Sequence, residues 1–281
     1  MAIDPEPLFV ATPLLAAHDA RLLEQVSRWS VLFGDWLAMS RVQALCKAAE
    51  PTVHDAFVSF AASIPGGGRW TCEATKMSKQ KNPPQLTSME LPLLRPALVR
   101  LRLRAICGVG ARADVVAELI GHARVWLRAS DFEHLGYTKR NVARLLSELC
   151  DAGFLRSLKE KNAIAYRLAD GGRWSDLVGA TAVTWPAWPA IFDFARLALR
   201  LDGERAKSEG VRRVAAAQTA HALEPLCDRL DLAQPPTATA NPQAWAATTA
   251  FVEREVAAFA GATSPSMSRA GGARGRVSAA R

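Results

Sequence analysis

The side chains with the most specific binding chemistry in this sequence are basic and amide groups between positions 138 and 161. Arginine donates paired hydrogen bonds to guanine, asparagine pairs in the same way with adenine, and lysine attracts phosphate. At about 100° per residue, Arg140, Arg144 and Ser147 fall on one face of a helix. This pattern indicates a surface that binds an anionic polymer rather than a catalytic centre.

Residues used in metal binding and catalysis form no comparable pattern. The 5 histidines never fall at metal spacing with a second histidine or a cysteine, and Cys-x-x-Cys does not occur. The glycines at 66–68 lack the Lys-Ser/Thr pair of a phosphate-binding loop, and no nucleophile elbow marks a catalytic serine. The 5 cysteines are odd in number and far apart, which favours reduced thiols. We therefore expect no metal, no cofactor and no enzymatic activity.

The basic face requires a helix that begins near position 139, and the preceding residues predict one. Ser130 to Glu133 has the capping-box pattern, which predicts a short helix over Asp131–Leu135. Gly136 then supplies the positive backbone angle of a tight turn, and Thr138 is a suitable N-cap for the next helix.

That next helix is predicted over residues 139–152, and a hairpin is predicted after it. Its buried stripe has helical spacing and consists of Val142, Leu145, Leu146 and Leu149. Gly153 is placed to end the helix. Two short strands, 154–159 and 163–168, are joined by Glu160–Asn162. The residues expected to alternate inward are Ile164, Tyr166 and Leu168.

Apolar periodicity predicts further helices on both sides of this segment. They cover residues 14–47 (as one or two helices), 53–64, 111–120, 190–201, 211–232 and 242–260. Val99 to Arg104 alternates with period two, as a strand would. We favour a helix through Ile106 because Pro96 suits a helix first turn. The organisation expected is an N-terminal helical region 1–64, a loop 65–92, a central domain 93–180, a C-terminal helical region 185–261 and a disordered basic tail 262–281.

The net charge of +8 is concentrated in two places. Residues 91–180 hold 15 basic and 9 acidic side chains, and residues 262–281 hold four arginines and no acid. The two remaining blocks, 1–90 and 181–261, each hold 8 basic and 9 acidic side chains. The charge therefore assigns an anionic partner to the central block.

The order of helix, short helix, turn, longer helix and basic-tipped hairpin resembles the winged helix-turn-helix of bacterial transcription regulators, in the group that includes the ArsR-like and MarR-like families. Ser130–Val142 and Leu145–Leu155 carry the resemblance, which covers about residues 95–170 with 112–120 as the first helix. It implies a mainly α fold with a small β-hairpin wing, flanked by N- and C-terminal helical regions. The recognition helix 139–152 would enter the major groove, and the wing 154–168 would contact the backbone. The DNA-binding residues implied are Thr138, Lys139, Arg140, Asn141, Arg144, Ser147, Lys159 and Lys161, with Arg156 as a weaker candidate.

Two hypotheses from different classes follow. The first is a sequence-specific transcriptional regulator that binds double-stranded DNA as a homodimer, through helices 14–47 and 190–232, with a small-molecule or protein effector between them. We expect it in the cytoplasm and not in a membrane, because Asp4 and Glu6 stand where a signal peptide is basic and no long apolar run occurs. The alternative is a winged-helix adaptor that docks another protein, for instance in a defence or toxin–antitoxin system.

Overall fold

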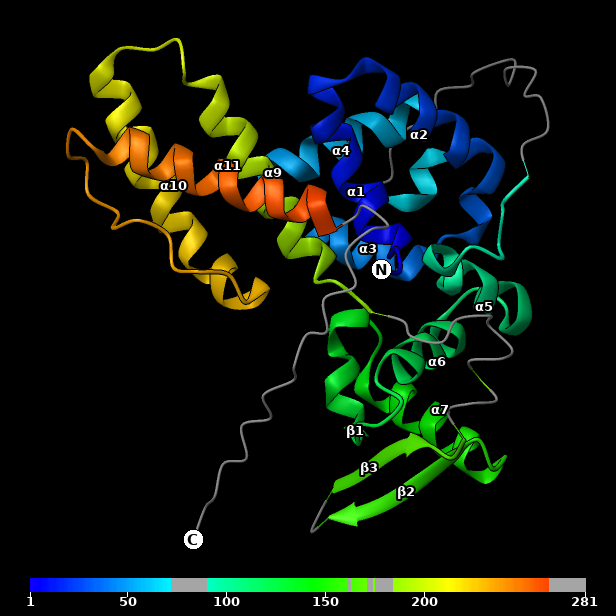
Figure 1. The fold of residues 1–281 in the computed structure, drawn as a ribbon. Helices are drawn as coiled ribbons and strands as arrows, with labels where there is room; N and C mark the ends of the chain where they lie inside the picture. Colours follow the sequence, from blue (N-terminus) through cyan, green and yellow to red (C-terminus); the bar gives the residue numbers. More distant parts are fainter. Residues whose placement is uncertain (72–89, 161–162, 171–173, 175–183, 263–281) are drawn as a thin grey trace, which may run out of the picture. The chain divides into compact units, whose positions relative to one another are not determined.

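The computed structural model describes residues 1–71, 90–160, 163–170, 174 and 184–262 (Figure 1). These residues are mainly helical, with one small sheet. The chain divides into two compact units, Met1–Phe192 and Asp193–Arg281. Within the described residues no helix is long and apolar enough to cross a membrane. The predicted tail lies outside the described residues, apart from its first position.

Four helices form the N-terminal part of the first unit: α1 (Pro5–Leu15), α2 (Ala20–Phe33), α3 (Met39–Ala48) and α4 (Pro51–Ser63). The segment 14–47, predicted as one or two helices, contains α2 and α3, which are separated by a 3₁₀ turn at Gly34–Trp36. Helix α4 begins at Pro51, since proline suits a first turn. Helix α1 has no counterpart in the sequence analysis, because its three prolines hide the helical pattern.

An aromatic cluster forms the core of these helices. Phe9 lies edge-on to Phe57 at 5.3 Å and to Trp70 at 4.9 Å between ring centroids. Trp70 is 2% exposed, so this end of the predicted loop 65–92 packs into the core. Gly34 permits the packing, because a Cβ there would lie 2.7 Å from the indole ring of Trp70. Residues 72–89 of that loop lie outside the described part of the chain.

Two helices follow the loop: α5 (Val99–Cys107), entered through a 3₁₀ turn at Pro96–Leu98, and α6 (Ala111–Gly121). The alternating Val-Arg-Leu-Arg segment is therefore helical, as we favoured. Arg100 and Arg104 are both buried. Because they lie one helical turn apart, both guanidiniums reach the buried carboxylate of Asp114. In a strand, residues four apart in sequence are separated by about 13 Å.

A small sheet and one longer helix complete the central part of the unit. In chain order the elements are β1 (Leu127–Arg128), η5 (Ala129–Leu135, a 3₁₀ helix), α7 (Lys139–Asp151), β2 (Leu155–Glu160) and β3 (Ala163–Leu168). The strands are antiparallel in the order β1-β3-β2, with Leu155 opposite Leu168 and Leu127 opposite Tyr166. The predicted helix and hairpin are thus present.

Glycines end both helical segments as predicted. Gly136 has φ +75° after η5, and Gly153 has φ +77° after α7. At the second position the amide of Gly153 donates to the carbonyl of Cys150, and that of Phe154 donates to Leu149, both at 2.9 Å. These two bonds satisfy carbonyls that the end of α7 would otherwise leave open.

Two local predictions are wrong. The capping box does not use Ser130 and Glu133: the 3₁₀ helix begins earlier, and the Asp131 carboxylate accepts from the Arg128 amide at 2.8 Å. Ile164 does not point into the core but is 48% exposed, because the hairpin tip extends past the helices that cover Tyr166 and Leu168.

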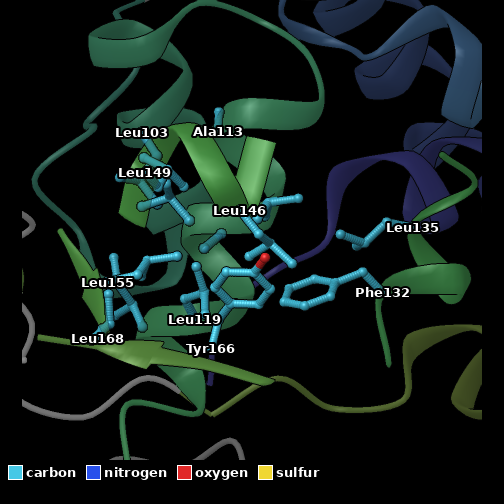
Figure 2. Packing of buried hydrophobic residues seen from close by; sticks show 14 of the residues in the cluster. Leu103, Ala113, Leu119, Phe132, Leu135, Leu146, Leu149, Leu155, Tyr166 and Leu168 are labelled. Carbon is cyan, nitrogen blue, oxygen red and sulfur yellow. The ribbon is translucent and has the colours of Figure 1, made fainter. Parts of the chain in front are cut away.

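The second core cluster lies between α5, α6, α7 and the sheet. Figure 2 shows the Tyr166 ring of β3 beside Phe132 of η5 and Leu146 of α7, with Leu119 of α6 nearby. The predicted stripe of α7 is confirmed, since Val142, Leu145, Leu146 and Leu149 are all buried. This packing presents the opposite face of α7 to solvent.

The second unit is helical. Helix α9 (Trp188–Gly203) runs into it from the first unit, and α10 (Glu209–Leu230) and α11 (Ala244–Ala262) follow, close to the predicted bounds. Helices α10 and α11 pack along each other (Figure 1). Phe194 of α9 lies edge-on to Phe259 of α11, with ring centroids 5.6 Å apart.

Leu146 is the side chain that tests this packing, because it is fully buried between α7, η5 and the sheet. We expect Leu146→Ala to lower the free energy of unfolding by about 2–5 kcal/mol, through lost burial and a residual cavity. Urea unfolding followed by circular dichroism measures the change. Leu158→Ala, at a position 41% exposed, is the matched control and should cost less than about 0.5 kcal/mol. Equal losses in the two variants would contradict the packing described.

Candidate nucleic-acid interface

The predicted contact residues of α7 lie on its solvent face. Lys139, Arg140, Arg144 and Ser147 are exposed, and Asn141 is half-buried. Thr138 caps the helix as predicted: its hydroxyl oxygen accepts from the amide of Asn141 at 3.3 Å. Cations in this first turn oppose the helix dipole, which favours negative charge at an N-terminus. Their placement at this end is therefore unfavourable for the isolated helix and suits an external anion.

Arg144 is not a free cation. It forms an ion pair with Glu148 one turn later, and its Nη2 donates to Oδ1 of Asn141 at 3.2 Å. Glu148 also binds Arg112 of α6 at 2.8 Å. Of the predicted cations on α7, only Lys139 and Arg140 lack an ion-pair partner among the described residues. An exposed pair of this kind is worth about 0.2–1 kcal/mol, so a phosphate can displace Glu148 from Arg144.

Of the cations expected on the hairpin, Lys159 and Arg156 fall within the described residues. Lys159 is exposed on β2, opposite Ile164 of β3, and Lys161 lies outside the described residues. Arg156 is also exposed; its cross-strand neighbour Arg167 stacks on Trp126 with 4.7 Å between the guanidinium carbon and the ring centroid. Exposed apolar side chains flank Lys159, because Leu158 and Ile164 are 41% and 48% exposed.

Behind α7 lies a group of buried charges that the sequence analysis did not identify. We call it the buried ionic cluster. Its members come from the N-terminal segment and α1, α3, α5 and α6, and are Asp4, Glu6, Arg41, Arg100, Arg104, Asp114 and Glu118. None is more than 9% exposed. The N-terminal helices and the central part of the unit therefore meet at a set of ion pairs.

Arg41 and Arg104 connect the N-terminus to the rest of the cluster. Arg41 binds both carboxylate oxygens of Asp4, at 2.9 and 2.7 Å, and an oxygen of Glu6 at 2.7 Å. Arg104 binds the other Glu6 oxygen at 2.5 Å and Asp114 at 2.8 Å. Glu6 also accepts from the amide of Ala38 at 2.8 Å. One carboxylate of α1 is thus held by two guanidiniums and a backbone amide.

Arg100 occupies the opposite side of the cluster. Its Nη2 lies 2.8 Å from Glu118 and its Nη1 3.3 Å from Asp114. The guanidinium stacks on Trp185, 4.5 Å from the ring centroid, and the indole N–H of Trp185 donates to the carbonyl of Ala117 at 3.0 Å. The chain after the hairpin therefore returns to cover this arginine.

The cluster reaches the turn before α7 through two side chains. The hydroxyl of Tyr137 donates to Asp114 at 2.8 Å, and Nε2 of His134 lies 3.5 Å from Glu118. Tyr137 immediately precedes the N-cap Thr138. Since Tyr137 is tied to a fully buried carboxylate, the first turn of α7 is fixed relative to α6 and, through Arg104, to α1.

Opposing effects act on the carboxyl groups of the cluster. Burial alone would raise the pKa of Asp114, but the guanidiniums of Arg104, Arg100 and Arg41 outweigh it and hold that pKa below its ordinary value. The pKa of Asp4 is lowered in the same way, against its burial, by Arg100 and Arg41. Glu118 also has a lowered pKa, because His134 and Arg100 outweigh its burial. Burial and the neighbouring Asp114 raise the pKa of Tyr137, which stays protonated and donates.

A signal for this cluster was present in the sequence. Arg100 and Arg104 are four residues apart, and so are Asp114 and Glu118, so each pair occupies one face of its helix. We counted the arginines as part of the excess positive charge of residues 91–180. The structure pairs both arginines internally. Because Asp114 and Glu118 of the same block are buried with them, the excess of basic side chains in residues 91–180 is unchanged, but these two arginines are not available to an external anion.

In the described part of the chain, no group of three His, Cys, Asp or Glu side chains is arranged to hold a metal ion. Comparisons of the chain with protein-family models, with curated proteins and with solved structures give no match.

Removing one cation tests the cluster. In Arg104→Met the side-chain volume is nearly kept, but Glu6 and Asp114 each lose a partner while buried. We expect a loss of about 3–5 kcal/mol in the free energy of unfolding. Arg112→Met, which breaks an exposed pair with Glu148, is the control and should cost at most about 1 kcal/mol. Similar urea midpoints for the two variants would show that the cluster contributes no more than a surface pair.

The lowered carboxyl pKa values predict acid sensitivity. A carboxyl whose pKa is lower in the folded state contributes stability above its ordinary pKa and loses it as the pH falls. We therefore expect the urea midpoint to decrease below about pH 4.5, where unfolded Glu and Asp side chains take up protons. Glu118→Gln removes one of these groups and should give a shallower decrease. A midpoint that is constant or rises between about pH 5 and 3 would contradict the lowered pKa values.

Proposed function

We propose that this chain is a bacterial transcriptional regulator that binds double-stranded DNA sequence-specifically, through a winged helix-turn-helix formed by residues 95–170. The order α6, β1, η5, α7, β2, β3 and the sheet order β1-β3-β2 support the proposal. The observation that carries it is the exposed first turn of α7, where Lys139 and Arg140 lack acidic partners among the described residues. The regulator is proposed to act in the cytoplasm as a homodimer under a small-molecule or protein effector, and not as an enzyme.

In this proposal α7 lies in the major groove with its N-terminal turn at the base edges. Arg140 donates to guanine O6 and N7, and Lys139 contacts phosphate. Arg144 exchanges Glu148 for a phosphate. Asn141 reads adenine once its amide oxygen is released from Arg144, so the two residues engage DNA together. Lys159 of the wing contacts the backbone beside the groove.

In the proposed complex, the buried ionic cluster holds the DNA-contacting residues of α7 in position. Base discrimination requires the recognition residues to be held within a fraction of an ångström, because hydrogen bonds weaken steeply with misalignment. The Tyr137–Asp114 hydrogen bond holds the turn from which α7 begins. A change in the packing of α1 therefore reaches the first turn of α7 through Glu6, Arg104 and Asp114.

The second candidate is a winged-helix adaptor that binds a protein. Two observations favour it: apolar Leu158 and Ile164 are exposed beside Lys159, and Glu148 neutralises part of the charge on α7. An apolar hairpin tip suits a protein partner better than a phosphate backbone.

Replacing the two unpaired cations tests DNA binding. Lys139→Ala with Arg140→Ala should reduce affinity for random duplex DNA at least tenfold at low salt. The magnitude of the slope of log affinity against log salt should fall by about 0.9, because Lys139 is the phosphate contact of the pair and each such contact contributes about 0.9. Fluorescence anisotropy with a labelled duplex measures both quantities.

The matched control is Lys47→Ala with Lys207→Ala, which removes the same charge from exposed positions that belong neither to α7 nor to the hairpin. This control should keep nearly the affinity and slope of the natural chain. Equal weakening in both double variants would place binding outside α7. No duplex binding at low salt, together with a co-purifying protein lost on Leu158→Asp, would favour the adaptor.

A further inference from the structure

A cavity of about 350 Å³ lies between α9 and α10 in the second unit, and neither core cluster includes it. Its lining comes from α9, the turn that follows α9, and α10. The residues are Leu197, Arg200, Leu201 and Glu204 on the side of α9, and Gly210, Val211, Val214, Ala215, Gln218, Thr219 and Ala222 on the side of α10. Both sets repeat at three and four residues, which is the spacing of a helix face that packs against other helices.

The face of α10 that lines this cavity differs from the one that packs inside the unit. Ala216, Ala220, Leu223 and Cys227 are buried along one face, as the neighbour α11 requires. In contrast, Val211 and Val214 on the cavity side are 46% and 50% exposed. Two adjacent half-exposed valines beside small residues form an apolar seam without a covering helix among the described residues.

Two opposite charges lie on the α9 side of this seam. Arg200 is exposed and Glu204 is half-buried, and neither has an ion-pair partner among the described residues. They are four residues apart and both line the cavity, with Arg200 in the last turn of α9 and Glu204 immediately after the helix ends. Across a two-fold axis between antiparallel copies of α9, Arg200 of each copy would face Glu204 of the other. The dimer then contains two Arg200–Glu204 ion pairs between the copies, related by the two-fold axis.

We propose that the α9–α10 face binds a second copy of this chain, with the two cavities facing each other across a two-fold axis. Val211 and Val214 of each copy are covered by the α9–α10 face of the other, which gives a four-helix core. Gln218 is the polar position in the seam, which fixes the alignment of the helices. This narrows the expected dimer surface, helices 14–47 and 190–232, to one face of the second unit. The interface goes beyond DNA binding and does not depend on it.

Charge reversal at the two-fold contact tests the proposal. We expect the natural chain to sediment as a dimer without DNA. Arg200→Glu alone and Glu204→Arg alone each place like charges opposite each other twice, so each should weaken dimerisation at least tenfold. The double variant Arg200→Glu with Glu204→Arg should recover the dimer. Mixing the two single variants should form heterodimers, because all four charges are then opposite their complements.

Lys207→Glu is the control, since it makes the same charge change as Arg200→Glu at an exposed position that does not line the cavity. It should leave the dimer intact, and Val211→Glu with Val214→Glu should give a folded monomer. A natural chain that is monomeric at about 100 µM, where an interface of standard size is occupied, would overturn the proposal. Dimerisation that is equally strong in the natural chain, in Arg200→Glu and in Glu204→Arg would also overturn it. Because no DNA is present, these outcomes are separate from those of the anisotropy experiment.

Discussion

The structure depends on a buried set of three guanidiniums and four carboxylates, which come from the N-terminal segment, α1, α3, α5 and α6. Each of these charges is stable in the interior only because the others pair with it. Moving several ions out of water is costly, and the cost is offset only when each finds close partners. The first unit buries Asp4 and Glu6 near its N-terminus because their carboxylates complete this set. In this unit, the packing of α1 and the position of the turn before α7 are therefore coupled, because Glu6, Arg104, Asp114 and Tyr137 form one chain of contacts.

This constraint also changes how the charge of the chain should be interpreted. Arg100 and Arg104 belong to the most basic block of the sequence, yet their charges face Glu6, Asp114 and Glu118. A second set, Arg112 of α6 with Glu148 and Arg144 of α7, is linked at the surface. Among the cations of α7, those without an acidic partner in the described part of the chain are Lys139 and Arg140, both in its first turn. That turn is the one that Tyr137 ties to the buried ionic cluster.

Much of the fold was predictable because local signals are strong where apolar spacing, caps and glycines agree. Several features follow from backbone geometry and burial, which depend on neighbours in the chain. They are the buried stripe Val142–Leu149, the N-cap Thr138, and the glycines 136 and 153 that end the helical segments. The exposed positions of Lys139 and Arg140 followed from the same periodicity. Helix α1 was missed because three prolines are unusual in a helix, although two of them suit a first turn.

The pairing of distant charges was not predictable, because sequence spacing specifies a face but not what covers it. Glu6 and Arg104 are 98 residues apart, and only packing of α1 against α5 brings their atoms to 2.5 Å. Likewise the sequence does not reveal that Asn141 is held by Arg144, or that Ile164 extends past the core. The sequence by itself determined the helices, the hairpin and the basic face of α7, since these depend on local periodicity. The tertiary structure decided which charges remain available to a partner, because burial and long-range pairing neutralise the others.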